Sequence, residues 1–153
     1  MSHFNDFKTQ ITNQAALVRA LCRCKNANGQ VIKLSQIEIS EIAKVLTGYD
    51  ARNGGKVQHA NVILRKGDNH FFNDYNDIGF VKQPDGTFKA VVSDYYKDPA
   101  WLNTLFTYYN VETAKMAFEV KGKEYVESLD DKGRIQLRAK FEAPNTSRIK
   151  TRS

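Results

Sequence analysis

Residues 78–93 read IGFVKQPDGTFKAVVS, and this stretch predicts a β-hairpin. At its centre, Gln83–Thr87 combines a proline, whose φ angle is fixed, with a glycine that tolerates positive φ, as a tight turn requires. After the turn, Phe88, Ala90 and Val92 alternate along the chain, which is typical of one face of a strand. The hairpin therefore predicts an antiparallel sheet at the centre of the fold.

The sequence that follows the hairpin predicts a helix. Asp98-Pro99 is typical of a helix start, with aspartate as N-cap and proline at the first helical position. An apolar stripe comes next and comprises Leu102, Leu105, Phe106 and Tyr109. Met116, Ala117 and Val120 have the spacing to continue it, with a break predicted near Asn110.

The N-terminal half predicts strands around a shorter helix. Residues 4–11 have the pattern of a strand, Thr12-Asn13 that of a helix N-cap, and residues 14–24 that of a helix. Asn53-Gly54-Gly55 is typical of a hairpin turn, and it precedes a strand in which Ala60, Val62 and Leu64 alternate.

Residues 31–46 carry conflicting signals. Ile39, Ile42, Ala43 and Leu46 have the spacing of an amphipathic helix. The many β-branched residues of the same stretch favour a strand instead. We predict a short helix over Ser40–Leu46, preceded by a strand.

Together these elements indicate the α+β class, with a mostly antiparallel sheet of five or six strands and two main helices. A turn at Asp130–Gly133, between Tyr125-Val126 and a strand over Ile135–Phe141, adds a final hairpin. The length of 153 residues suggests one domain, which we place at residues 1–144. Residues 145–153 have almost nothing to bury, so we expect a basic, disordered tail.

The charge of the chain is uneven. Residues 132–153 contain seven basic residues and one acidic residue, Glu142, and so account for the whole formal net charge of +6. No apolar run approaches the roughly 18 residues of a membrane span, and residues 1–6 do not resemble a secretory signal. The expected location is the cytoplasm, or the plastid stroma if the gene is encoded in a plastid. No membrane partner is expected.

The sequence contains no recognisable catalytic or metal-binding motif, so we predict no catalytic residue, no metal and no cofactor. His3, His59 and His70 lack the spacing of zinc helices, and Gly54-Gly55-Lys56 lacks the remaining residues of a phosphate loop. Cys22 and Cys24 are expected to be structural, one facing the core and the other leaning outward.

A site assembled from separate elements stays open. Asp77 and Asp94 flank the central hairpin and could approach each other at its open end, where Tyr109 could also line a pocket. The alternative is that Asp77 ends a loop and Asp94 caps a turn.

The basic C-terminal end carries the candidate site. On the strand from Arg134 to Phe141, alternate residues form a polar ladder, and the tail adds further cations. The candidate anion-binding residues are Arg134, Arg138, Lys140, Arg148, Lys150 and Arg152. The alternative is that basic side chains on an exposed strand deter edge-to-edge aggregation.

Short motifs along the chain resemble a known family. They are Met1–Phe4, Lys8–Ile11, Asp77–Phe80, Asp85–Thr87, Val91–Asp94, Tyr109–Lys115 and Asp131–Leu137. Their order is similar to that of the hypothetical chloroplast reading frame 35 family, a family of unknown function found in plastids, cyanobacteria, other bacteria and phages. The resemblance implies no activity. Members of the family are sometimes encoded beside an AAA-type ATPase, so the resemblance implies an accessory or partner-binding role. This chain is longer than the family pattern between Gly29 and Gly48.

Three functions remain open. The first is a non-enzymatic accessory or interaction domain that binds a protein partner. The second is binding of nucleic acid or another polyanion through the basic C-terminal strand and tail. The third is an enzyme or small-ligand binder with a spatially assembled site.

Overall fold

The computed structural model describes residues 4–25, 29–48, 57–65, 77–93 and 100–140. Its elements are β1 (Phe4–Lys8), α1 (Gln14–Leu21), the 3₁₀ turn η1 (Leu34–Gln36), β2 (Ile37–Val45), β3 (His59–Leu64), β4 (Ile78–Lys82), β5 (Phe88–Ser93), α3 (Ala100–Val120), β6 (Tyr125–Leu129) and β7 (Ile135–Ala139). The chain divides into two compact units, Met1–Tyr109 and Asn110–Ser153, and each is described by itself. The assignment of residues 1–144 to one domain stays a prediction.

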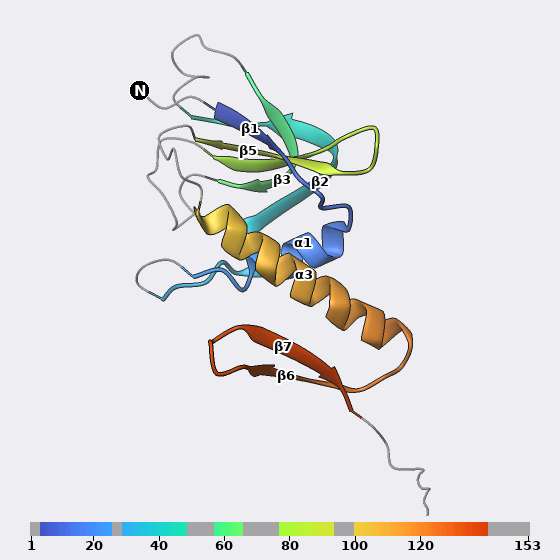
Figure 1. The fold of residues 1–153 in the computed structure, drawn as a ribbon. Coiled ribbons are helices and arrows are strands. Elements are labelled where there is room, and N and C mark those ends of the chain that lie inside the picture. Colours follow the sequence, from blue (N-terminus) through green and yellow to red (C-terminus); the bar gives the residue numbers. More distant parts are fainter. Residues whose placement is uncertain (1–3, 26–28, 49–56, 66–76, 94–99, 141–153) are drawn as a thin grey trace, which may run out of the picture. The chain divides into compact units, whose positions relative to one another are not determined.

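The first unit is built on a five-stranded antiparallel sheet with the order β1-β5-β4-β3-β2 (Figure 1). The predicted central hairpin is confirmed as β4 and β5, with Lys82 opposite Phe88. Its turn is closed by the Gln83 N–H, which donates to the Thr87 carbonyl at 2.7 Å. Gly86 has a φ of 89°, which explains why a glycine follows Asp85.

Helix α1 begins where the sequence predicted. The Asn13 side chain accepts a hydrogen bond from the Ala16 N–H at 3.0 Å, and it thereby satisfies one of the free N–H groups of the first turn. The hydroxyl of the buried Tyr109 accepts from the Thr12 and Asn13 N–H groups, each at 3.0 Å. The helix ends at Leu21, earlier than the predicted Cys24.

The main core lies on the face of the sheet along which α1 and the start of α3 run (Figure 1). Its largest fully buried side chains come from the strands, from α1, from α3 and from the segments beside α1; they include Phe80, Phe88, Leu64, Leu17, Leu105, Ile11 and Ile32. The other face holds a smaller cluster of Leu46, Ala60, Ile63 and Val91, against which Phe4 and Val81 pack. Apolar burial on both faces explains why the middle strands are nearly continuously hydrophobic.

The predicted helix over Ser40–Leu46 is wrong, because residues 37–45 form the edge strand β2. The apparent helical spacing has a different cause. Ile39 pairs with Val62 and Lys44 pairs with Ala60, so residues 40–43 bulge out opposite Asn61 alone. A bulge resets the two-residue alternation of a strand, and apolar residues can then recur at other spacings.

Asn61 holds this bulge in place. Its Nδ2 group donates to the carbonyls of Ser40 and Glu41 at 3.1 and 2.9 Å, and its Oδ1 accepts from the Lys82 N–H at 2.9 Å. The side chain is almost fully buried, and it supplies hydrogen-bond partners to three backbone groups beside the irregular pairing.

Helix α3 runs through Asn110 without the predicted break. Its proposed start signal, Asp98-Pro99, lies outside the described residues. No helix in the described part of the chain is long and apolar enough to cross a membrane.

The second unit contains the final hairpin, which is confirmed as β6 and β7 with the turn Asp130–Gly133 between them. The hairpin forms a sheet of its own and does not extend the five-stranded sheet. The phenyl ring of Phe118 stacks on that of Tyr125, with ring centroids 5.7 Å apart, so α3 and β6 are in contact within this unit. The α+β class is confirmed: the described residues form a five-stranded antiparallel sheet, a two-stranded sheet and two α-helices.

Candidate functional site

The predicted basic ladder lies on β7, but acidic residues of the same hairpin oppose part of it. The Arg134 Nε donates to Asp130 Oδ2 at 2.8 Å, and the Lys140 Nζ lies 3.6 Å from Glu124 Oε1. The backbone N–H of Arg134 is the main cause that lowers the pKa of Asp130, which keeps this carboxylate charged. Arg138 is opposite Val126, and within the described residues it has no ion pair.

The remaining members of the anion-binding prediction are Arg148, Lys150 and Arg152, which lie outside the described residues. Anion binding by this end of the chain stays a prediction. Three of the six candidate residues lie in the described hairpin, and acids of the same hairpin pair with two of these three.

The pocket proposed around Asp77, Asp94 and Tyr109 stays a prediction, because the structure describes only two of these three residues. Asp94 lies outside the described residues. The Tyr109 hydroxyl accepts from the backbone at the start of α1, and Asp77 belongs to a separate polar network at the end of β2. Tyr109 therefore has a structural role in capping α1.

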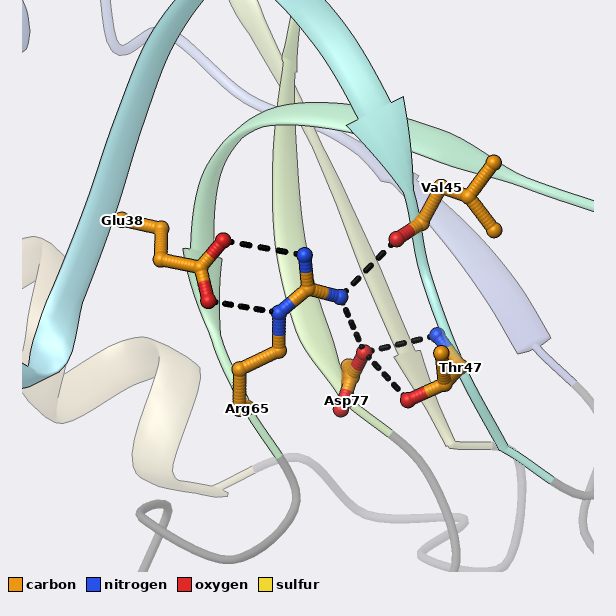
Figure 2. A network of polar contacts seen from close by, with 5 residues as sticks. All are labelled: Glu38, Val45, Thr47, Arg65 and Asp77. Carbon is orange, nitrogen blue, oxygen red and sulfur yellow. Dashed lines mark hydrogen bonds and ion pairs between the residues drawn. The ribbon is translucent and has the colours of Figure 1, made fainter.

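The network around Asp77 is centred on Arg65, which sequence reasoning missed (Figure 2). The Arg65 Nε and Nη2 groups donate to the two oxygens of Glu38 at 2.7 and 2.9 Å. The Nη1 group donates to the Val45 carbonyl and to Asp77 Oδ2, both at 2.8 Å. Figure 2 shows Glu38 and Val45, from the two ends of β2, on opposite sides of the guanidinium.

Asp77 is fully buried and anchors the other side of the network. Its Oδ2 accepts from the Thr47 N–H at 2.6 Å and from the Thr47 hydroxyl at 2.9 Å, while the Asp77 N–H donates to the Thr47 carbonyl at 2.9 Å. The signal for this site was the position of Arg65 directly after β3 and of Asp77 directly before β4. This signal can be interpreted only once Leu64 is known to pair with Ile78, because that pairing brings Arg65 close to Asp77.

The electrostatics favour the charged form of the partners. The hydrogen bond from Arg65 is the main cause that lowers the pKa of Glu38, and the bond to Glu38 is the main cause that raises the pKa of Arg65. Both Glu38 oxygens accept from Arg65, and Asp77 Oδ2 accepts from Arg65 and Thr47. We interpret the network as a clamp that joins the two ends of β2 to β3 and β4.

The lowered pKa of Glu38 gives a pH prediction for Glu38→Gln. A carboxylate whose pKa is depressed in the folded state stabilises the fold above its ordinary pKa of 4.5, and this contribution is lost as the pH falls through the folded value. At pH 7 the free energy of unfolding of the wild type should exceed that of the variant by about 0.5 kcal/mol. The difference is small because Glu38 is partly exposed. Urea titrations from pH 7 to pH 3 should show the two stabilities converging; a constant difference contradicts the assignment.

The two cysteines occupy unreactive environments. Cys24 is buried, donates from Sγ to the Ala20 carbonyl at 3.6 Å, and has its pKa raised to about 12, chiefly by burial. Cys22 is half-buried, and burial raises its pKa as well. The prediction that one faces the core and the other leans outward is confirmed. In the described part of the chain, no three His, Cys, Asp or Glu side chains are grouped as metal ligands would be.

Exposed apolar side chains of the first unit gather in one stretch of sequence. Among the described residues, all its exposed large hydrophobic side chains fall within residues 31–57; they are Val31, Leu34, Ile39, Ile42, Val45 and Val57. Three of them lie on β2, and we call Ile39, Ile42 and Val45 the β2 patch. Ile42, in the bulge, is 84% exposed.

No family model, curated protein or solved structure matches this chain. The resemblance to the chloroplast reading frame family therefore stays a prediction that rests on the short motifs alone.

Proposed function

We propose that this protein is an interaction domain that binds a protein partner through the β2 patch. The observation that carries the proposal is the concentration of exposed apolar side chains on one edge strand of the sheet. Elsewhere in the described part of the first unit, the strands bury their large apolar side chains or keep them half-buried. Exposed apolar side chains that gather on one element are candidates for contact sites with other proteins.

The strand that carries the patch is held in shape. Asn61 donates hydrogen bonds to two carbonyls of the bulge. Arg65 bonds to both Glu38 and Val45 and so connects the two ends of β2. A surface that is already ordered loses less conformational entropy when a partner binds. The bulge therefore holds the backbone of the exposed Ile42 in a defined position. The partner we propose is a protein whose surface has an apolar pocket that binds this side chain.

The chemistry of the patch favours a protein over a polyanion. Isoleucine and valine side chains offer no hydrogen bond or charge to a phosphate, whereas nucleic-acid binding relies on cations that contact the backbone. The alternative site on the C-terminal hairpin is weakened because Asp130 and Glu124 pair with two of its three described cations. The AAA-type ATPase remains a candidate partner through the resemblance alone.

Ile42→Lys tests the proposal, with Val120→Lys as a matched control. Both positions carry exposed β-branched residues, at 84% and 88%, but Val120 is on α3 in the other unit. In pull-downs from lysate of the source cells, Ile42→Lys should reduce retention of a specific partner at least tenfold, because charge in an apolar hollow removes a central anchor. Val120→Lys should retain the partner like the wild type.

The outcome is read at two salt concentrations and against thermal melts. An apolar contact should persist at 0.5 M NaCl, whereas a polyanion held by the basic end should be lost. Equal retention by both variants, or binding that disappears with salt, contradicts the proposal. Unchanged melting temperatures ensure that lost retention reflects the surface and not the fold.

A further inference from the structure

A groove with both polar and apolar walls lies at the edge of the sheet opposite to β2. It has a volume of about 580 Å³ and is formed where the end of β1 meets the turn between β4 and β5. Its walls include Lys8, Gln10, Gln83, Asp85, Thr87 and Lys89. The volume falls in the range of small-molecule sites, roughly 300–1,000 Å³, but the lining is rich in amides, hydroxyls and ammonium groups.

The groove contains two lysines at directly opposed positions of neighbouring strands. Lys8 of β1 is the register partner of Lys89 of β5, which places both side chains on one face of the sheet. Like charges at such positions destabilise a sheet. The pair is therefore a feature that folding alone does not favour.

Nearby acids compensate this pair only in part. The Lys89 Nζ lies 3.0 Å from Asp6 Oδ2 on β1. Lys8 is exposed and, within the described residues, forms no ion pair. Asp85 lies in the groove wall, but its Oδ1 accepts from the N–H and the hydroxyl of Thr87 at 2.9 and 2.6 Å.

The same hydrogen bonds favour the charged form of Asp85. The hydrogen bonds from Thr87 are the main causes that lower its pKa, and the charge of Lys8 contributes least. Asp85 thus bonds within the turn, and Lys8 lines the groove without an ion pair to a described acid.

We propose that this groove binds a small anionic ligand, and that its carboxylate or phosphate group is held between Lys8 and Lys89. An anion at this position offsets the repulsion between the two ammonium groups, and the bond to Lys8 is charge-assisted. The amide of Gln10, which is exposed, supplies a further donor. The site is independent of the β2 patch, because β1 and β2 are the two opposite edges of the sheet.

The test is an NMR titration of the full chain, labelled with ¹⁵N, at constant ionic strength. Inorganic phosphate is the probe in one arm and succinate in the other, so the arms distinguish a phosphate from a carboxylate ligand. Backbone amides of residues 8–10, 83 and 85–89 should shift in a saturable manner with one or both probes. Lys8→Gln should weaken the apparent affinity about tenfold, whereas Lys132→Gln, at an exposed lysine of the β6–β7 turn, should leave it unchanged.

Two results overturn the proposal: shifts that do not saturate with either probe, or equal weakening by both variants. A second measurement separates binding from folding. Without added anion, Lys8→Gln should melt at the same or a higher temperature than the wild type, because it removes one of two opposed charges. A lower melting temperature also overturns the proposal, since it assigns Lys8 a structural role.

Discussion

Replacing Arg65 by methionine is expected to lower the free energy of unfolding by about 3 kcal/mol. Asp77 is fully buried, and the Arg65 Nη1 group lies 2.8 Å from its Oδ2 atom. Removing one partner of a buried ion pair leaves the other charge without compensation, which costs roughly 3–5 kcal/mol. Thr47 still donates two hydrogen bonds to the same oxygen, so the lower end of this range is expected.

Urea denaturation at pH 7 measures this effect, and Glu38→Gln is the matched control. Glu38 bonds to the same guanidinium but is partly exposed, so its loss should cost well under 1 kcal/mol. Adding Asp77→Asn to Arg65→Met should recover part of the loss, because the buried charge is then removed together with its cation. Equal costs for Arg65→Met and Glu38→Gln contradict the view that the network stabilises the buried Asp77.

The network also predicts where the loss is felt. Arg65 joins the two ends of β2, so amide protons of residues 38–45 should exchange faster in Arg65→Met than those of β4 and β5. The same variant should therefore bind the proposed partner more weakly than the wild type, because the β2 patch is less ordered. This links the stability of the clamp to the proposed interaction, although Arg65 itself is not part of the patch.

Gly79→Val is expected to cost about 3 kcal/mol or more. A Cβ atom at Gly79 would lie 2.6 Å from the Ala60 Cβ and 2.9 and 3.0 Å from the two methyl groups of Leu46. Gly79 lies on β4, opposite Ile63 of β3. Ala60 and Leu46 belong to the smaller buried cluster. Overpacking of a well-filled core typically costs 1–3 kcal/mol, and valine adds two further methyl groups to the clash.

Two further variants separate crowding from backbone strain at Gly79. In the double variant Ala60→Gly with Gly79→Ala, the destabilisation should be smaller than the sum of the two single changes, because one methyl group makes room for the other. Gly86→Ala should cost only about 1 kcal/mol, since a Cβ there meets no atom within 4 Å and the cost comes from the φ of 89°. Additive losses in the double variant contradict a steric origin.

Much of the fold could be predicted because its signals are local. The turn at Gln83–Thr87 is closed by bonds between residues at most four apart, and Asn13 caps α1 through a residue three positions away. The Asp130–Gly133 turn likewise fixes the last hairpin. In each case the residues that specify the geometry are the residues that make the bonds.

The prediction for residues 40–46 failed for the opposite reason. The bulge in β2 depends on Asn61, about 20 residues away, which supplies bonds to the carbonyls of Ser40 and Glu41. Local spacing matched a helix because the bulge interrupts the alternation of the strand. Tertiary pairing decided the outcome against a local pattern.

The sequence by itself determined the α+β class, the two described hairpins and the N-cap of α1, because short-range hydrogen bonds and turn chemistry encode them. Only the tertiary structure decided that β2 is an edge strand, that Arg65 meets both Glu38 and Asp77, and that Lys8 faces Lys89. These contacts join residues from 12 to more than 80 positions apart, and the register of the sheet sets which side chains meet. The candidate interaction and anion sites belong to this second group, because each depends on strands brought side by side.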